Sequence, residues 1–308
     1  MLFEIFLQLK NNKKFEVMRR GVFLAIIAAV CWGVSGTLGQ FLFQQKGVNV
    51  EWLITIRLLI SGLCLLIFAH VTNKDVFNIW KNRKDAIQLI VFSIIGMLGV
   101  QYTYFAAIKH SNAATATILQ FSGPIMIALY LAIKNKKIPN TIEIIAIILA
   151  VTGTFLLVTH GSLGSLAITP LALFLGLSSA ITLAFYSLQP KELLEKYHSA
   201  VVIGWGILMA GFIFSFVKAP WETKRYCDIE TFASIAFIIF LGSLAAFYSY
   251  LSATKIIGAQ KTSLLTSTEP LVACLLSVTW LKTPFSLIDW GASLCIISTV
   301  FLLSAKNK

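Results

Sequence analysis

The sequence is short of charge, of cysteine pairs and of nucleotide-binding motifs. Asp, Glu, Lys and Arg make up 12% of the 308 residues, about half of their share in a typical soluble domain. The five cysteines form no Cys-x-x-Cys pair and have no histidine at ligand spacing, which argues against a redox centre or a metal site. No Gly-x-x-x-x-Gly-Lys-Ser/Thr loop is present, so the chain itself is not expected to hydrolyse ATP.

What the sequence does contain is a series of apolar runs. Hydrophobic residues make up 57% of the chain, and the mean hydropathy is +0.83. Runs of about 18 to 22 residues are long enough for a helix to cross a hydrocarbon core of about 30 Å. They predict an all-α membrane protein with ten transmembrane helices, at residues 21–43, 52–71, 86–107, 112–133, 141–159, 170–189, 200–217, 231–253, 258–281 and 285–304.

Basic residues are distributed unevenly among the connections between these spans. With the N-terminus inside, 18 of the 25 Lys and Arg residues fall in inside segments and six in outside segments, while Arg57 lies within a span. The positive-inside rule then predicts that both termini are cytoplasmic. The net charge of +12 is thereby assigned to topology and to anionic lipid headgroups, so nucleic acid is not expected as a partner. Residues 1–20 lack the order of a signal peptide and are predicted to form a cytoplasmic N-terminal lead.

The chain also contains an internal repeat. The segment YTYFAAIKHSNAATATILQFSGP (102–124) aligns without a gap with YSYLSATKIIGAQKTSLLTSTEP (248–270), a shift of 146 residues. We therefore expect two five-helix repeats, 21–160 and 161–308, and because five is odd the second must be inverted relative to the first. Inverted repeats recur in secondary transporters, whose two halves rock about a site near the membrane midplane. A duplication with only structural consequences is the other interpretation.

One acid lies deep inside a predicted span. Glu269 directly precedes Pro270, at a depth where an acid costs about 2.5 to 3.5 kcal/mol on insertion scales unless it faces a partner or a wet cavity. Pro270 is predicted to kink the helix and to free backbone carbonyls. Pro124 is its counterpart in the first repeat, where Gly123 replaces the acid. Glu269 either senses substrate or a proton, or holds helices together through a hydrogen bond.

A pocket of mixed polar and aromatic character is predicted around this acid. A mostly apolar cavity with a few placed polar groups suits a small amphipathic organic solute. Tyr102 and Tyr104 lie near a span end and are expected to anchor the chain at the membrane interface. Arg57 lies a short way into its span and is expected to snorkel to the outer interface. The predicted substrate-binding residues are Trp32, Ser35, Gln120, Ser122, Tyr186, Tyr248, Thr266 and Glu269.

Several segments, taken in order, resemble a family of carriers. They are AAVCWGVSGT in the first span, ITIRLLISGLCLL in the second, SNAATATILQFSGPIMIAL in the fourth, and TSTEPLVACLLSVTWLKTPF running into WGASLCIISTVFLL. After about residue 20 the chain resembles EamA-type members of the drug/metabolite transporter superfamily. The resemblance implies an inner-membrane carrier that moves small metabolites, often outward, through a cavity formed mainly by spans 1, 3, 4, 6, 8 and 9. One departure is LKTPF, where family members commonly carry a glycine and an acid before the proline. Asp289 lies near the start of the last span and is expected to replace part of that negative charge at the N-terminus of the helix.

These observations favour a secondary active transporter of a small organic metabolite, an amino acid or a related solute, that works by alternating access as an exporter. Glu269 is the candidate for proton coupling, and no cofactor or metal is expected. The expected partners are the solute and membrane lipids, with the chain a monomer or a homodimer. The alternative is an intramembrane enzyme acting on a lipid-linked substrate, although such chemistry normally uses paired acids, a metal cluster or an activated nucleophile. A receptor or scaffold fits less well, because no long loop or soluble domain is present to relay a signal.

Overall fold

The structure is a computed structural model, and the regular elements in the part of the chain that it describes are all helices. The described residues are 2–123, 125–127, 130, 141–160, 167–222, 228–258, 262, 265, 266 and 268–305. The first half contains α1 (Leu2–Gln44), α2 (Val50–Val71), α3 (Asn78–Lys81), α4 (Arg83–Val91), η1 (Phe92–Leu98), α5 (Gly99–His110), α6 (Ala113–Gln120) and α8 (Thr141–Thr159). The second half contains α9 (Pro170–Leu188), α10 (Lys191–Lys196), α11 (Ser199–Phe214), α12 (Ile229–Ile239), η2 (Phe240–Ala245), α13 (Ala246–Ile257), α15 (Thr268–Thr279) and α16 (Leu287–Ala305).

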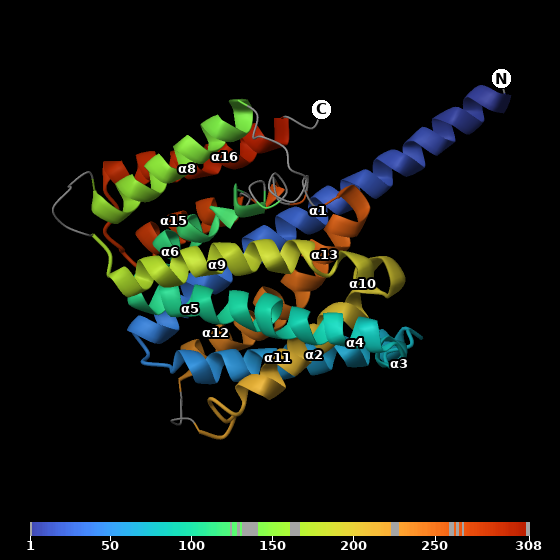
Figure 1. Ribbon diagram of the computed structural model, residues 1–308, viewed down its shortest axis with the longest axis horizontal. Coiled ribbons are helices and arrows are strands. Elements are labelled where there is room, and N and C mark those ends of the chain that lie inside the picture. The colour runs from blue at the N-terminus through green and yellow to red at the C-terminus, as the bar shows by residue number, and fades with distance from the viewer. Residues whose placement is uncertain are drawn as a thin grey trace.

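Each apolar run predicted from the sequence overlaps at least one of these helices. Five described helices are long and apolar enough to cross a membrane, namely Glu16–Gln44, Val50–Val71, Arg83–His110, Pro170–Lys196 and Ile229–Ile257. The first of them belongs to α1, which begins at Leu2, so the predicted N-terminal lead is continuous with the first helix and projects from the bundle (Figure 1).

The helices form three layers. α2 packs on α11 at one side of the molecule, and α8 packs on α16 at the other side (Figure 1). Between these two pairs lie α1, α5, α6, α9, α13 and α15, which contact one another across the centre. The start of α1 and the end of α16 lie toward the same end of the bundle, called here the terminal end.

The periphery of the bundle is strongly apolar. Phe23, Leu63, Ile148, Phe212 and Leu294 are large hydrophobic side chains that stay exposed on different helices. A surface of this kind is unfavourable in water, whereas lipid tails solvate it as well as another helix does. The exposed apolar side chains are therefore expected to face lipid.

Glycines bring the backbones of α2 and α11 close together. A Cβ atom on Gly62 would lie 2.5 Å from the backbone nitrogen of Leu208. Gly204 packs in the same way against Leu66, and Gly211 packs against the backbone of Leu59. Small residues at such positions replace side-chain interdigitation with direct backbone contact, which is typical of helix pairs in membranes. Because the residue numbers fall on α11 as they rise on α2, the two helices run antiparallel.

A π-helical segment interrupts each half at an equivalent position. η1 joins α4 to α5, and η2 joins α12 to α13. The shift of 146 residues found in the sequence carries η1 onto residues 238–244, which overlap η2 almost completely. The internal repeat in the sequence is therefore matched by a repeated irregularity of the backbone.

An exposed ion pair joins the two halves at the end opposite the terminal end. Lys46, between α1 and α2, donates to Asp228 Oδ1 at 3.0 Å and to Glu230 Oε2 at 2.9 Å. Asp228 is also the N-cap of α12, because its side chain accepts from the backbone N–H of Thr231 at 2.9 Å. The Thr231 N–H is the main cause that lowers the pKa of Asp228 to about 2, and Lys46 and the Thr231 hydroxyl lower it further.

We expect Asp228→Asn to change the pH dependence of thermal stability. The folded pKa lies below the value of about 3.9 for an unfolded aspartate, so the carboxylate stabilises the fold above that value and the contribution is lost as pH falls toward 2. The difference in Tm between wild type and the Asn variant, measured in detergent, should be largest above about pH 4 and should close near pH 2. Glu222→Gln, which removes an exposed pair with Lys218 within one loop, is the matched control and should change Tm little. A gap that stays constant down to pH 2 would contradict the assignment.

Candidate functional site

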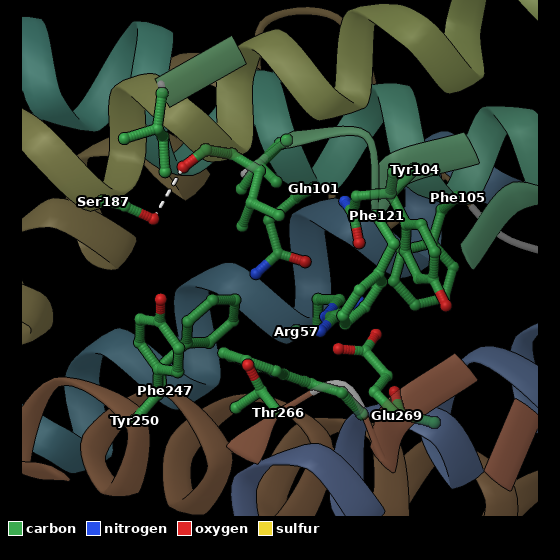
Figure 2. Close-up of a pocket in the computed structure, with 17 residues that line it drawn as sticks. Arg57, Gln101, Tyr104, Phe105, Phe121, Ser187, Phe247, Tyr250, Thr266 and Glu269 are labelled. Carbon is green, nitrogen blue, oxygen red and sulfur yellow. Dashed lines mark hydrogen bonds between the residues drawn. The ribbon is translucent and has the colours of Figure 1, made fainter. Parts of the chain in front are cut away.

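A central cavity lies among the helices of the middle layer. It has a volume of about 60 Å³, which is room for a few water molecules. Side chains from α1, α2, α5, α6, α9, α13 and α15 line it, together with residues that follow α6 (Figure 2). Charged and polar residues in the lining are Ser35, Arg57, Gln101, Tyr104, Gln120, Ser187, Tyr250, Thr266 and Glu269.

Glu269 enters this cavity from the first turn of α15. The helix begins at Thr268, and Pro270 occupies a position where its missing N–H costs no intrahelical bond. The backbone N–H of Glu269 donates to the carbonyl of Thr266 at 2.9 Å. Figure 2 shows the carboxylate pointing into the cavity, and the residue is only 5% exposed. Within the described part of the chain the carboxylate accepts no hydrogen bond.

Arg57 is the second charged group in the lining, and its predicted position was wrong. Instead of reaching the membrane interface, the side chain points inward and the residue is 1% exposed. Its Nε donates to Ser243 Oγ at 2.9 Å, and its Nη2 lies 3.5 Å from the carbonyl of Gly242. The guanidinium carbon lies 4.4 Å from the centre of the Phe105 ring, a cation–π contact. Ser243 and Gly242 belong to η2 of the other half, so this contact holds the arginine inside the bundle.

Three buried donors in the lining have no hydrogen-bond partner. They are Nη1 of Arg57 on α2, Nε2 of Gln101 on α5 and the hydroxyl of Ser35 on α1. Figure 2 shows the Gln101 amide, the Arg57 guanidinium and the Glu269 carboxylate directed toward the same part of the cavity. Unpaired donors in a buried place are costly, because they lose hydration and gain nothing in return.

Aromatic rings form the apolar wall of the cavity. The Trp32 ring lies 5.2 Å from the ring of Phe247 and 5.2 Å from that of Tyr250. Tyr104 was expected at the membrane interface, and this prediction was wrong: the residue is 8% exposed, and its hydroxyl lies 2.8 Å from Thr117 Oγ1. Gly36 on α1 makes this position possible, because a side chain there would collide with the Tyr104 hydroxyl. Tyr102 is half-buried and contacts Phe214.

The structure brings some of the predicted site residues together and separates others. Trp32, Ser35, Gln120, Thr266 and Glu269 all line the central cavity. The lining does not include Ser122, Tyr186 or Tyr248.

The residues outside the lining have other surroundings. Ser122 is buried nearby without a partner for its hydroxyl. Tyr186 is fully buried behind the wall, with its ring 5.8 Å from that of Phe92. Tyr248 lies against Phe68 of α2 at 5.9 Å. Pro124 lies outside the described residues.

Sequence reasoning missed several lining residues, and Arg57 and Gln101 are the two that matter most for the chemistry of the cavity. For Arg57 the signal was present, since a charged residue within a span is by default a functional candidate. Gln101 stands in the apolar run LGVQYTYF, and a lone amide there was the available sign. Helical geometry alone could not tell whether either side chain faced the cavity or lipid.

A larger polar hollow of about 440 Å³ opens near the end opposite the terminal end. Gln40, Gln44, Asn112, His160 and Asp289 are among its lining residues. Asp289 accepts from the backbone N–H of Ser286 at 2.7 Å and lies 2.8 Å from His160 Nε2. The Asp289 side chain therefore stabilises the N-terminus of α16.

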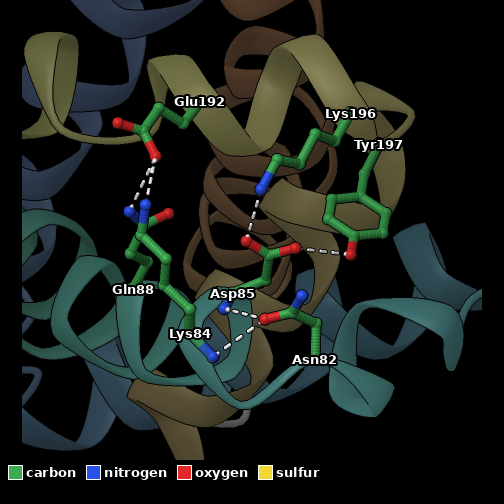
Figure 3. Close-up of polar contacts among 7 residues, drawn as sticks. All are labelled: Asn82, Lys84, Asp85, Gln88, Glu192, Lys196 and Tyr197. Atoms are coloured by element: carbon green, nitrogen blue, oxygen red, sulfur yellow. Dashed lines mark hydrogen bonds and ion pairs between the residues drawn. The ribbon is translucent and has the colours of Figure 1, made fainter.

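A polar cluster joins the two halves at the terminal end (Figure 3). Asp85 of α4 accepts from Lys196 Nζ and from the Tyr197 hydroxyl, each at 2.8 Å. Beside it, Gln88 donates to Glu192 Oε2 at 3.0 Å. Asp85 is 2% exposed whereas the Lys196 side chain is 47% exposed, so the cluster lies at the edge of the bundle.

Comparisons with known proteins agree on one class of protein. The model of the EamA-like transporter family matches residues 19–159 and 170–305. The "Uncharacterized inner membrane transporter YicL" of Salmonella typhimurium is 38% identical, over 94% of this chain and 97% of that protein. The "Uncharacterized transporter YetK" of Bacillus subtilis is 27% identical, over 94% of this chain and 88% of that protein. A crystal structure superposes with a TM-score of 0.62 at 15% identity, covering 96% of this chain and 99% of the other, which supports the fold.

Proposed function

The chain belongs to the EamA-like transporter family and is a membrane transporter, and from this premise we propose that it exports a small organic metabolite, an amino acid or a related solute, by alternating access. The relative from Salmonella is named as an inner membrane transporter. We place this chain in the same type of membrane as a multi-pass protein with both termini in the cytoplasm, as the distribution of basic residues favours.

The observation that carries the proposal is the central cavity, in which one carboxylate and one guanidinium face a wall of aromatic rings. A mostly apolar lining with a few placed polar groups suits an amphipathic solute. The cavity of about 60 Å³ is far smaller than the roughly 300–1,000 Å³ of ordinary ligand sites. Binding a metabolite therefore requires the halves to move apart, as alternating access demands.

We infer that the two halves are related by an inverted twofold arrangement. Gly62 of α2 contacts Leu208 of α11, and these two residues are equivalent under the shift of 146 residues. Equivalent helices that cross antiparallel at equivalent residues lie about a twofold axis. At the other side of the molecule, Gly153 of α8 packs against Ile296 of α16, close to the same relation. Such symmetry lets one half rock against the other around a central site.

Polar contacts between the halves close both ends of the bundle. The Asp85–Lys196 cluster acts at the terminal end, and the Lys46–Asp228 pair acts at the opposite end. In a rocking mechanism these contacts break in turn, because opening one end separates the elements that its contacts join. The terminal end is the cytoplasmic end in the proposed topology.

We expect Asp85→Asn to shift the population toward the state that is open at the terminal end. The variant keeps an acceptor but loses the charge opposite Lys196, which at the edge of the bundle should shift the population by up to roughly fivefold. Ser187 lines the cavity near that end, and Ser187→Cys, in a background without the native cysteines, reports access to a membrane-impermeant maleimide. Labelling from the cytoplasmic side should rise by a similar factor. Asp75→Asn is the control, because it removes an exposed 4.0 Å contact to Lys81 and keeps an acceptor oxygen for the backbone N–H groups of Phe77 and Asn78. Equal labelling in all three proteins would argue against the gate.

The proposed function is tested by counterflow in proteoliposomes. Purified protein would be loaded with one unlabelled solute and offered the same solute in labelled form, using amino acids, amines, nucleosides and sugars in separate assays. We expect protein-dependent exchange of amino acids. If only amines, nucleosides or sugars are exchanged, one of those classes replaces amino acids as the proposed solute. If no class is exchanged, the proposed transport function is wrong.

A proton and the solute can compete for the same carboxylate. Glu269 is the acidic residue in the cavity lining, and ionised carboxylates buried at this depth need a neutralising partner. We infer that it carries either a proton or the cationic group of the solute. Such competition couples solute movement to the proton gradient without ATP.

A further inference from the structure

We propose that Arg57 and Gln101 form an oxyanion subsite that recognises a carboxylate of the transported solute. This proposal rests on the proposed transport function and specifies its solute as a carboxylate-bearing one. Three features of the cavity support it: a guanidinium without a counter-ion, unpaired donors on both residues, and contacts that hold the guanidinium in place.

The charge of Arg57 lacks a counter-ion inside the protein. Within the described part of the chain, no carboxylate oxygen lies within 4.0 Å of its nitrogens, and its polar contacts go to a hydroxyl and a carbonyl. An arginine 1% exposed in the membrane interior is costly unless an anion or water meets it. The solute is the natural source of that anion, because the guanidinium lines the cavity that the solute must enter.

The unpaired donors identify the chemistry of the ligand group. Nη1 of Arg57 and Nε2 of Gln101 are both buried without partners. A group that satisfies them must present acceptor oxygens, and a guanidinium fork matches the two oxygens of a carboxylate. An amide, an amine or an apolar group offers fewer or no such acceptors.

The position of the guanidinium is fixed before the solute arrives. Ser243 holds Nε at 2.9 Å, and Phe105 lies beneath the guanidinium plane at 4.4 Å. The Ser243 hydroxyl in turn donates to the carbonyl of Ile238 at 2.9 Å, which leaves its oxygen as the acceptor for Arg57. Ordering a flexible side chain in advance reduces the entropic cost of binding.

Glu269 supplies the opposite charge in the same cavity (Figure 2). A solute that carries both a carboxylate and an ammonium group can therefore pair with Arg57 through one and with Glu269 through the other. This arrangement gives the solute a fixed orientation. Truncating either charged group of the solute should remove one of these two contacts.

The test compares L-amino acids with their α-carboxamides in a thermal-shift assay of the full-length protein. A ligand that binds the folded state raises its Tm. In the unmodified protein we expect the acids to raise Tm and the matched carboxamides to raise it much less. α-Aminophosphonic analogues form a third arm, and a shift equal to or larger than that of the acids would assign the subsite to phosphoryl oxyanions rather than carboxylates, overturning the assigned class.

Arg57→Gln should weaken binding of the acid by about 10- to 100-fold, as expected for a lost charge-assisted hydrogen bond, and should abolish the preference for acid over carboxamide. Arg57→Lys should restore part of the preference, because it keeps the charge but not the fork. Gln101→Leu leaves Arg57 and its anchors intact and should reduce affinity for the acid alone. This second variant keeps the test valid should Arg57→Gln not fold.

Two results would overturn the subsite. One is an equal Tm shift from acids and carboxamides in the unmodified protein, and the other is a folded Arg57→Gln variant that keeps the wild-type preference. The counterflow assay distinguishes a wrong subsite from a wrong transport function. Exchange of solutes that lack a carboxylate contradicts the subsite alone, whereas absence of exchange in every class contradicts transport itself.

Discussion

Glu269→Gln is expected to lose proton-driven transport. The variant preserves the shape of the side chain but cannot take up or release a proton, and no hydrogen bond to another described residue has to be replaced. With a pH gradient imposed on proteoliposomes, we expect solute accumulation to fall by at least about tenfold, because the buried carboxylate is the group that must be neutralised. Exchange without a gradient should weaken less, since Arg57 still holds the carboxylate of the solute.

The control for this prediction is an acid outside the cavity. Glu222 lies in an exposed loop and pairs with Lys218, so Glu222→Gln should leave gradient-driven accumulation unchanged. Glu269→Asp keeps the charge with a shorter reach and should retain part of the coupling. Full gradient-driven accumulation in Glu269→Gln would remove Glu269 from the coupling step and leave its role structural.

Gly62→Val is expected to destabilise the protein more than any other single glycine change that avoids the cavity. The new Cβ would lie 2.5 Å from the backbone nitrogen and 2.7 Å from the Cα of Leu208. Backbone atoms cannot rotate away, so α2 and α11 must separate along their length. Overpacking costs about 1–3 kcal/mol or more, and we expect Tm in detergent to fall by roughly 5 °C or more.

Gly291→Ala provides the matched control. Gly291 lies within α16, and a Cβ atom there would meet nothing within 4 Å. Alanine favours helix by up to about 1 kcal/mol over glycine, so this variant should keep or slightly raise Tm. A Gly62→Val protein with the Tm of wild type would show that the α2–α11 contact is not as close as described.

The membrane-spanning helices could be predicted from the apolar runs, because a helix in lipid must be long and apolar on every side. The repeat was readable because Tyr102 and Tyr248, with their flanking residues, stayed aligned without a gap. The π-helical segments were not predicted, since no local sequence signal marks them. Their overlap under the same shift became visible only in the backbone.

Side-chain direction limited the prediction of the site. Trp32, Gln120 and Glu269 were placed in one pocket, and all three line the cavity. Arg57 was assigned to the interface because its distance from the span end allows snorkelling. Only the contact with η2 of the other half, through Ser243, explains why it turns inward, and such tertiary contacts between distant segments have no signature in a single sequence.

The π-helical turn η2 has a consequence for how the chain can change in length. A π-turn holds one residue more than an α-turn in the same length of helix, so losing that residue would leave an ordinary α-turn and keep the following side chains on the same face. Phe247 and Tyr250, which follow η2, would then stay in the cavity wall. Deletion of one codon within η2 is therefore a change that a lineage of such carriers can absorb without reshaping the cargo compartment, whereas the same deletion in a regular α-helix would turn every later side chain by about 100°.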